Sequence, residues 1–261
     1  MAIDWAAAET LLALGICPIG IADLGGFLRS FPGTLPACSI ADLGSTWEPN
    51  LELIDRMGPA LIYISPWNAL AQAAVEDIAP VRISPIYAGK GRPLETARSF
   101  AEQIHSDFPQ ASDPGALAAL ENRHDRLRGV CAETREQPVL IVNLHGSGRF
   151  ANVYGGSSMA GNVLEHIGMQ NAWTERTNGF GFARIGIERL VEIKAASIVV
   201  IDQGEQTARA LRILDASAIW KAVPVVRSGK THLSPPLSIF GGLATAVNFA
   251  EWLVGALGRD G

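Results

Sequence analysis

The feature that most constrains the fold of this chain is a regular alternation of short apolar runs with helix-like segments. Residues 60–65 (Ala-Leu-Ile-Tyr-Ile-Ser) and 139–144 have the length and β-branched content of buried strands, and residues 81–86 predict another. Helix-like segments occur at residues 51–57 and after Pro93, a residue that suits the first turn of a helix. Strands that alternate with helices pair in mainly parallel sheets, so we expect an α/β fold.

One long segment without a strand signal divides the chain. Residues 114–135 carry a narrow apolar stripe among charged residues, which predicts one long amphipathic helix. The apolar positions are Leu117, Leu120, Leu127 and Val130. We therefore predict an N-terminal α/β lobe at residues 1–112, a connecting helix at residues 113–136 and a C-terminal α/β lobe at residues 137–261.

The two predicted lobes resemble each other in sequence. A segment at residues 50–64 contains Leu51-Glu52 and ends in an apolar run, and residues 186–200 repeat this pattern with Ile187-Glu188. Two similar lobes that face each other leave a cleft, and clefts between domains are common ligand sites. We expect the ligand of this protein to bind in such a cleft.

The composition excludes several classes of protein. The net charge is −5 and there is no run of basic residues, which argues against nucleic acid or an anionic membrane as a partner. Hydrophobic residues make up 48% of the chain, enough for a sizeable core. Residues 237–257 are apolar over a membrane-spanning length, but Asn248 and Glu251 favour a C-terminal core helix. The chain opens without a signal peptide, so we expect either a cytoplasmic protein or one whose leader has been removed.

Neither metal nor cysteine chemistry has a sequence signature here. The three cysteines, Cys17, Cys38 and Cys131, are too few and too scattered for a disulfide framework or a Cys-based zinc site. At least one thiol is left over, and whether any cysteine is oxidised stays open. The five histidines form no i, i+4 pair, so we expect no directly bound metal and no cofactor.

A serine in a glycine-rich loop leaves an enzyme as the alternative. Ser158 follows Gly155-Gly156 and could act as the nucleophile of an α/β hydrolase, with His145 or His232 as its base. The loop does not match the Gly-x-Ser-x-Gly pattern of such enzymes, so we favour a serine that shapes a turn or caps a helix.

Several aromatic residues stand in loops, among glycines and prolines, rather than on a periodic face. They are Trp47, Trp67, Phe180, Phe182 and Phe240. Core packing explains such positions less well than contact with a ligand, because these residues lie next to expected helix starts or within turns. The pattern favours a binding protein.

A series of motifs extends over nearly the whole chain. It consists of Ile3-Asp4-Trp5 continuing to Gly15, Trp47-Glu48-Pro49-Asn50-Leu51-Glu52, Asn171-Ala172-Trp173, Thr177-Asn178, Ile219-Trp220-Lys221-Ala222-Val223-Pro224 and Gly229-Lys230. In this order the motifs resemble the FhuD-like iron–siderophore binding proteins of ABC importers, which are class III substrate-binding proteins. The resemblance implies two α/β lobes joined by one long helix, with a shallow ligand cleft and little hinge closure. It also implies a location in the periplasm, or at the outer cell surface with a lipid anchor, and a leader that this sequence lacks.

The resemblance also implies positions for ligand contacts. The family's hydroxamate-binding arginine falls on Thr46, its cleft tyrosine on Asn68, and the tryptophan after its Thr-Asn motif on Phe180. Its Trp-Phe-Tyr run falls on Ser238-Ile239-Phe240, so ferrichrome-type recognition is in question. The candidate ligand-binding residues are Arg29, Thr46, Trp47, Trp67, Asn68, Asn178, Phe180, Phe182, Ser238 and Phe240. Arg149 and Arg184 are further cations that could meet an anionic chelate.

We therefore expect a monomeric, non-enzymatic protein that captures a ferric siderophore and delivers it to an ABC transporter permease. The siderophore itself encloses the iron, so the protein needs no metal ligands. Glu52 and Glu188, one in each lobe, match the family's docking pattern and are predicted to meet the permease. Haem, cobalamin or a bare metal ion is the alternative ligand within the same fold.

Overall fold

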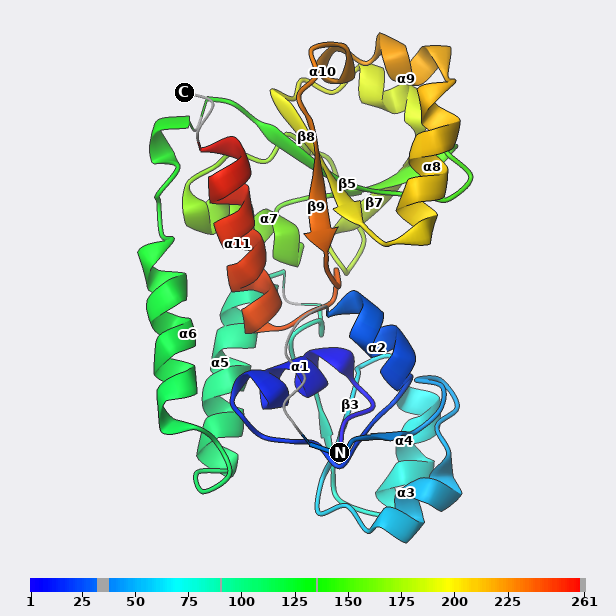
Figure 1. Cartoon of the computed structure of the whole chain (residues 1–261), viewed down its shortest axis with the longest axis vertical. Helices are drawn as coiled ribbons and strands as arrows, with labels where there is room; N and C mark the ends of the chain where they lie inside the picture. Colours follow the sequence, from blue (N-terminus) through cyan, green and yellow to red (C-terminus); the bar gives the residue numbers. More distant parts are fainter. Residues whose placement is uncertain (32–37, 90, 135, 259–261) are drawn as a thin grey trace. The chain divides into compact units, whose positions relative to one another are not determined.

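The computed structural model describes residues 1–31, 38–89, 91–134 and 136–258, and it confirms the α/β class. The chain forms two compact units (Figure 1). Unit 1 comprises Met1–Ala88, Leu94–Asn122 and Phe240–Thr245. Unit 2 comprises Gly89–Pro93, Arg123–Ile239 and Ala246–Gly261.

The strands of unit 1 are short and parallel. They are β1 (Gly20–Ile21), β2 (Ala41–Asp42), β3 (Ile62–Ile64) and β4 (Val81–Ile83). β1 pairs with β2 and β3 pairs with β4, while Ala2 bridges Ile21 and Tyr63 and so links the two pairs. The strands predicted at residues 60–65 and 81–86 are thus confirmed.

Helices make up much of the N-terminal half of the chain. They are α1 (Trp5–Ala13), α2 (Leu24–Ser30), α3 (Leu51–Met57), α4 (Ala69–Glu76), α5 (Pro93–Asp107) and α6 (Pro114–Arg126). Asp4 accepts a hydrogen bond from the Ala7 amide at the start of α1, and Asn50 accepts one from the Leu53 amide at the start of α3.

Helix α6 is shorter than the helix predicted at residues 113–136, and Arg135 lies outside the described residues. Gly129 has a φ of +66°, a left-handed conformation that interrupts a right-handed helix. The Gly129 and Cys131 amides donate to the carbonyls of His166 and Ile167 instead of to the preceding helical turn. A 3-10 turn, η1 (Ala132–Thr134), follows. Hydrogen bonds to a distant segment therefore end the helix before its apolar stripe ends.

Unit 2 contains a five-stranded mixed sheet of order β7-β6-β5-β8-β9. Its strands are β5 (Val139–Leu144), β6 (Phe150–Tyr154), β7 (Phe182–Gly186), β8 (Ser197–Asp202) and β9 (Thr231–Pro236). β5, β8 and β9 are parallel, whereas β6 is antiparallel to both β5 and β7. The strand predicted at residues 139–144 is confirmed as β5, which is buried along its whole length.

The remaining helical elements belong to the C-terminal half. They are α7 (Met159–Ile167), the 3-10 helix η2 (Ile187–Val191), α8 (Glu205–Asp215), α9 (Ala218–Ala222), α10 (Pro224–Arg227) and α11 (Leu243–Leu257). One face of the sheet packs Leu140, Val142 and Val200 against buried Trp173 and Trp220. The expected C-terminal core helix is confirmed as α11, with Val247 and Leu253 among its buried residues. No helix in the described part of the chain is long and apolar enough to cross a membrane.

Two of the three cysteines form a disulfide that the sequence pattern did not identify. Cys17 and Cys38 are bonded across 21 positions, so the bond closes a loop that contains β1 and α2. Cys131 is buried and lies outside this bond.

Candidate functional site

In unit 1, two loops that the sequence nominated for ligand binding are tied together by one buried carboxamide. Asn68 is 2% exposed, and its Nδ2 donates to the Thr46 carbonyl at 2.8 Å. Its Oδ1 accepts from the amide and the hydroxyl of Ser65, at 3.1 and 2.5 Å. Asn68 therefore holds the loop of Thr46 and Trp47 against the loop of Trp67, and its polar atoms serve that bracing.

Three aromatic rings form a cluster in the same unit. The ring centroid of Phe240 lies 5.7 Å from that of Trp67 and 5.1 Å from that of Tyr87, and Trp67 and Tyr87 are 6.3 Å apart. Tyr87 was not among the predicted site residues. Its position just after β4, like that of Trp67 after β3, is the signal that could have identified it.

The other predicted residues of unit 1 lie at the surface. Trp47 is 65% exposed, more than any other large hydrophobic side chain among the described residues. Arg29 is exposed in the last turn of α2. An indole this exposed offers a large apolar face to a partner.

In unit 2, Asn178 shapes the loop that presents Phe180 and Phe182. Its Oδ1 accepts from the amides of Phe180 and Phe182, at 3.0 and 3.2 Å. Phe180 is 40% exposed, while Phe182 begins β7 and its ring contacts Tyr154 at 6.1 Å. Phe180 is therefore the more accessible of the two rings.

The remaining polar candidates of unit 2 differ in accessibility. Arg149 and Arg184 are exposed, and the Arg184 Nε approaches the Asn152 Oδ1 at 3.4 Å from the neighbouring strand. Ser238 is 8% exposed, so it has little surface to offer a ligand. Tyr154 is the last residue of β6, and burial of its hydroxyl raises its pKa well above the ordinary range.

The serine considered as a nucleophile is a helix cap. Ser158 is 2% exposed, and its Oγ accepts from the Gly161 amide at 2.9 Å at the start of α7. The same hydroxyl donates to the Gly155 carbonyl at 2.7 Å, so its proton is held by the backbone and not by a base. His145 in turn contacts the Ser147 hydroxyl within its own turn, at 2.8 Å. The hydrolase alternative is therefore wrong.

The two predicted docking acids are both exposed at the start of helical turns. Glu52 lies in the first turn of α3, which Asn50 caps. Glu188 lies in the first turn of η2, a 3-10 helix, and its carboxylate folds over Gly186. A carboxylate is favoured in either place because the amides at a helix start are unsatisfied donors.

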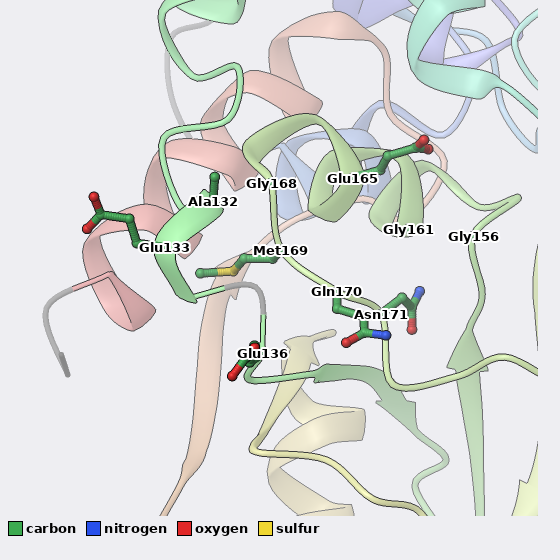
Figure 2. Close-up of a pocket in the computed structure, with 10 residues that line it drawn as sticks. All are labelled: Ala132, Glu133, Glu136, Gly156, Gly161, Glu165, Gly168, Met169, Gln170 and Asn171. Atoms are coloured by element: carbon green, nitrogen blue, oxygen red, sulfur yellow. The ribbon is translucent and has the colours of Figure 1, made fainter.

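A hollow of about 780 Å³ in unit 2 is lined by three glutamates whose carboxylates do not converge (Figure 2). Figure 2 shows Glu133, Glu136 and Glu165 on separate segments, with carboxylates that point apart around Met169. Throughout residues 1–31, 38–89, 91–134 and 136–258, no group of three or more His, Cys, Asp or Glu side chains could hold a metal ion.

Comparison with known proteins identifies the class to which this fold and these surfaces belong. The chain belongs to the periplasmic binding protein family, whose model matches residues 1–236. It is therefore a substrate-binding protein and not an enzyme. It is 30% identical to the iron(3+)-hydroxamate-binding protein FhuD of Escherichia coli over 260 residues, which cover 99% of this chain and 86% of that protein.

Solved structures show the same fold. The siderophore-binding protein FhuD of Vibrio cholerae, crystallised with Fe3+–Desferal, superposes with a TM-score of 0.86 at 22% identity, covering 98% of this chain and 96% of that one. The petrobactin-binding protein YclQ of Bacillus subtilis gives a TM-score of 0.79 at 19% identity, with coverage of 99% and 91%.

Proposed function

We propose that this protein captures a ferric siderophore and delivers it to the permease of an ABC importer. The observation that carries the proposal is the similarity to the E. coli hydroxamate-binding protein along the full chain. The aromatic cluster of unit 1 and the exposed Phe180 of unit 2 supply a chemistry that agrees with it.

Recognition on this proposal combines stacking with hydrogen bonding and charge. The organic faces of a ferric chelate pack on Trp67 and Phe240 of unit 1, since flat rings bury large apolar areas at low entropic cost. The chelate oxygens carry partial or full negative charge and accept hydrogen bonds. Because the siderophore encloses the iron, the protein contributes no ligand to the metal.

The ligand preference is proposed to be shifted away from neutral trihydroxamates such as ferrichrome. The resemblance described above implies an arginine at the position of Thr46, and a hydroxyl cannot reproduce the planar set of donors of a guanidinium. Arg29, Arg149 and Arg184 are exposed, so an anionic chelate is the ligand class that these surfaces suit better.

Delivery is proposed to use Glu52 and Glu188 as contacts to arginines of the permease. We place the protein in the periplasm or at the outer cell surface, where it acts as a monomer. The Cys17–Cys38 disulfide supports this location, because such bonds persist in oxidising compartments.

Native mass spectrometry of protein purified from iron-limited cells tests the proposal. The expected result is a complex whose added mass equals one organic chelator plus one iron. A tetrapyrrole, a corrinoid or a bare metal ion on the protein would instead contradict the siderophore assignment.

A further inference from the structure

One buried carboxylate in unit 1 accepts hydrogen bonds from donors in a segment far along the chain. Glu9, on α1, is 8% exposed. Its Oε2 accepts from the Gly242 amide at 2.5 Å, and its Oε1 accepts from the amide and the hydroxyl of Thr245 at 2.5 and 2.8 Å. Burial raises the pKa of this carboxyl, while the three hydrogen bonds act in the opposite direction.

These bonds fix the chain at the beginning of α11, which starts at Leu243. The approach is close, because a Cβ added at Gly242 would lie 2.7 Å from the Thr10 Oγ1 and 3.3 Å from the Ala6 carbonyl. Only glycine fits there without displacing α1 or the segment. A further hydrogen bond lies one residue earlier, where the Tyr87 hydroxyl donates to the Gly241 carbonyl at 2.6 Å.

The residue next to this clamped pair of glycines is Phe240, whose ring packs on Trp67 and Tyr87. The backbone of Phe240 is therefore fixed by Tyr87 on Gly241 and by Glu9 on Gly242 and Thr245. We infer that Glu9 is a positioning residue that sets the aromatic cluster for the ligand, acting through the segment Phe240–Thr245. The inference rests on the proposed function, since it assigns the cluster to ligand stacking.

The geometry explains why a carboxylate is needed at this position. Three donors converge on its two oxygens, and an ionised carboxylate offers acceptors only. Glutamine has nearly the same size but one acceptor oxygen, and its NH2 group would face the donors of Thr245. Glu9→Gln should therefore release one end of the segment while preserving the volume of the core.

The test compares Glu9→Gln with a matched control at Glu251, a second glutamate that holds α11 by hydrogen bonds. Glu251 accepts from Arg123 at 2.6 Å, and it also anchors α11, but away from Phe240. The ligand probe is the tightest binder among ferric Desferal, a ferric citrate-hydroxamate and a ferric catecholate. We expect Glu9→Gln to raise the dissociation constant roughly tenfold, or about 1.4 kcal/mol, and Glu251→Gln to leave it within about twofold.

A spectroscopic readout without ligand separates positioning from general loss of stability. Glu9→Gln should alter the near-UV circular dichroism of the apo protein, and the change should vanish in a Trp67→Phe background. Tyr87→Phe, which removes only the hydroxyl that holds Gly241, should reproduce both effects if Glu9→Gln fails to fold.

Two results would overturn the inference: an unaltered aromatic spectrum, or wild-type affinity in a folded variant with an altered spectrum. If the wild-type protein binds none of the three probes, the proposed function fails. The spectrum then still decides whether Glu9 positions the cluster, because that measurement needs no ligand.

Discussion

At the scale of single residues, the carboxamides of Asn68 and Asn178 form hydrogen bonds with the protein's own loops. Asn68 joins the Thr46 loop to the Trp67 loop, and Asn178 folds the turn that carries Phe180. On the proposed function, these loops contribute to ligand binding through the aromatic rings that they present. Residues that the sequence nominated as ligand contacts can therefore act by shaping the loops around them.

Thr46→Arg should strengthen hydroxamate binding. The Thr46 backbone carbonyl is already bonded to Asn68, so a longer side chain can be placed here without breaking that contact. A guanidinium that donates to chelate oxygens should improve the binding free energy of ferric Desferal by about 1.5–3 kcal/mol. Isothermal titration of both proteins measures the difference, with Thr46→Gln as the uncharged control. If ferrichrome proves the tightest ligand of the unsubstituted protein, our interpretation of Thr46 is wrong.

At the scale of elements, two contacts join segments that are distant in the sequence: one between α6 and α7, and the Cys17–Cys38 disulfide. The end of α6 is held to the end of α7, where the His124 and His166 rings stack at 4.0 Å and the His166 Nε2 donates to the His124 carbonyl at 2.7 Å. The disulfide closes the segment around α2. Each feature predicts a separate dependence of stability on solution conditions.

The stability of unit 2 should fall as the pH drops below about 6.5. Burial, and after it the charges of His124 and Arg128, lowers the pKa of His166 from its ordinary value of 6.5, although its bond to the His124 carbonyl and the charge of Asp125 oppose this. The unfolded chain then binds a proton more tightly than the folded one, so acid favours unfolding. Melting temperatures from pH 7.5 to 5.5 should decline less steeply in His166→Asn. Parallel slopes in both proteins would count against a role for this histidine.

Removing the disulfide should destabilise the protein by about 3 kcal/mol, the scale for a closed loop of this length. Cys17→Ser with Cys38→Ser removes the cross-link from the unfolded state, and denaturant unfolding measures the loss. Reductant should lower the stability of the unsubstituted protein to the level of the double variant, and should leave the variant unchanged. Equal stability of the two proteins without reductant would show that the bond contributes nothing.

Elements that depend on near neighbours could be predicted from the sequence, and those that depend on distant partners could not. The apolar run of β5 and the cap and first turn of α3 follow from adjacent residues. The end of α6 depends on carbonyls of α7, and the pairing of Cys17 with Cys38 depends on how the loop returns. The hydrogen bonds of Glu9 could not be predicted from the sequence, because its partners Gly242 and Thr245 are far along the chain.

At the scale of the whole molecule, the proposed delivery to a permease has Glu52 and Glu188 act on a partner and not only on their own helices. We expect Glu52→Ala and Glu188→Ala to leave ligand affinity and folding unchanged but to impair iron uptake in cells, and the double variant to impair it more. Uptake of the labelled ferric ligand and solution affinity are measured side by side, with Glu192→Ala as an exposed control. Normal uptake by the double variant would leave these acids with helix stabilisation alone.

Tryptophan fluorescence reports directly whether the protein binds a ferric siderophore at its aromatic surfaces. A ferric chelate absorbs light and should approach Trp47 and Trp67, so micromolar additions should quench the emission in a saturable way. Trp67→Phe and Trp47→Phe should each reduce the quenched fraction. We expect quenching by at least one of the hydroxamate, citrate-hydroxamate and catecholate complexes. Unchanged emission with all three would contradict it.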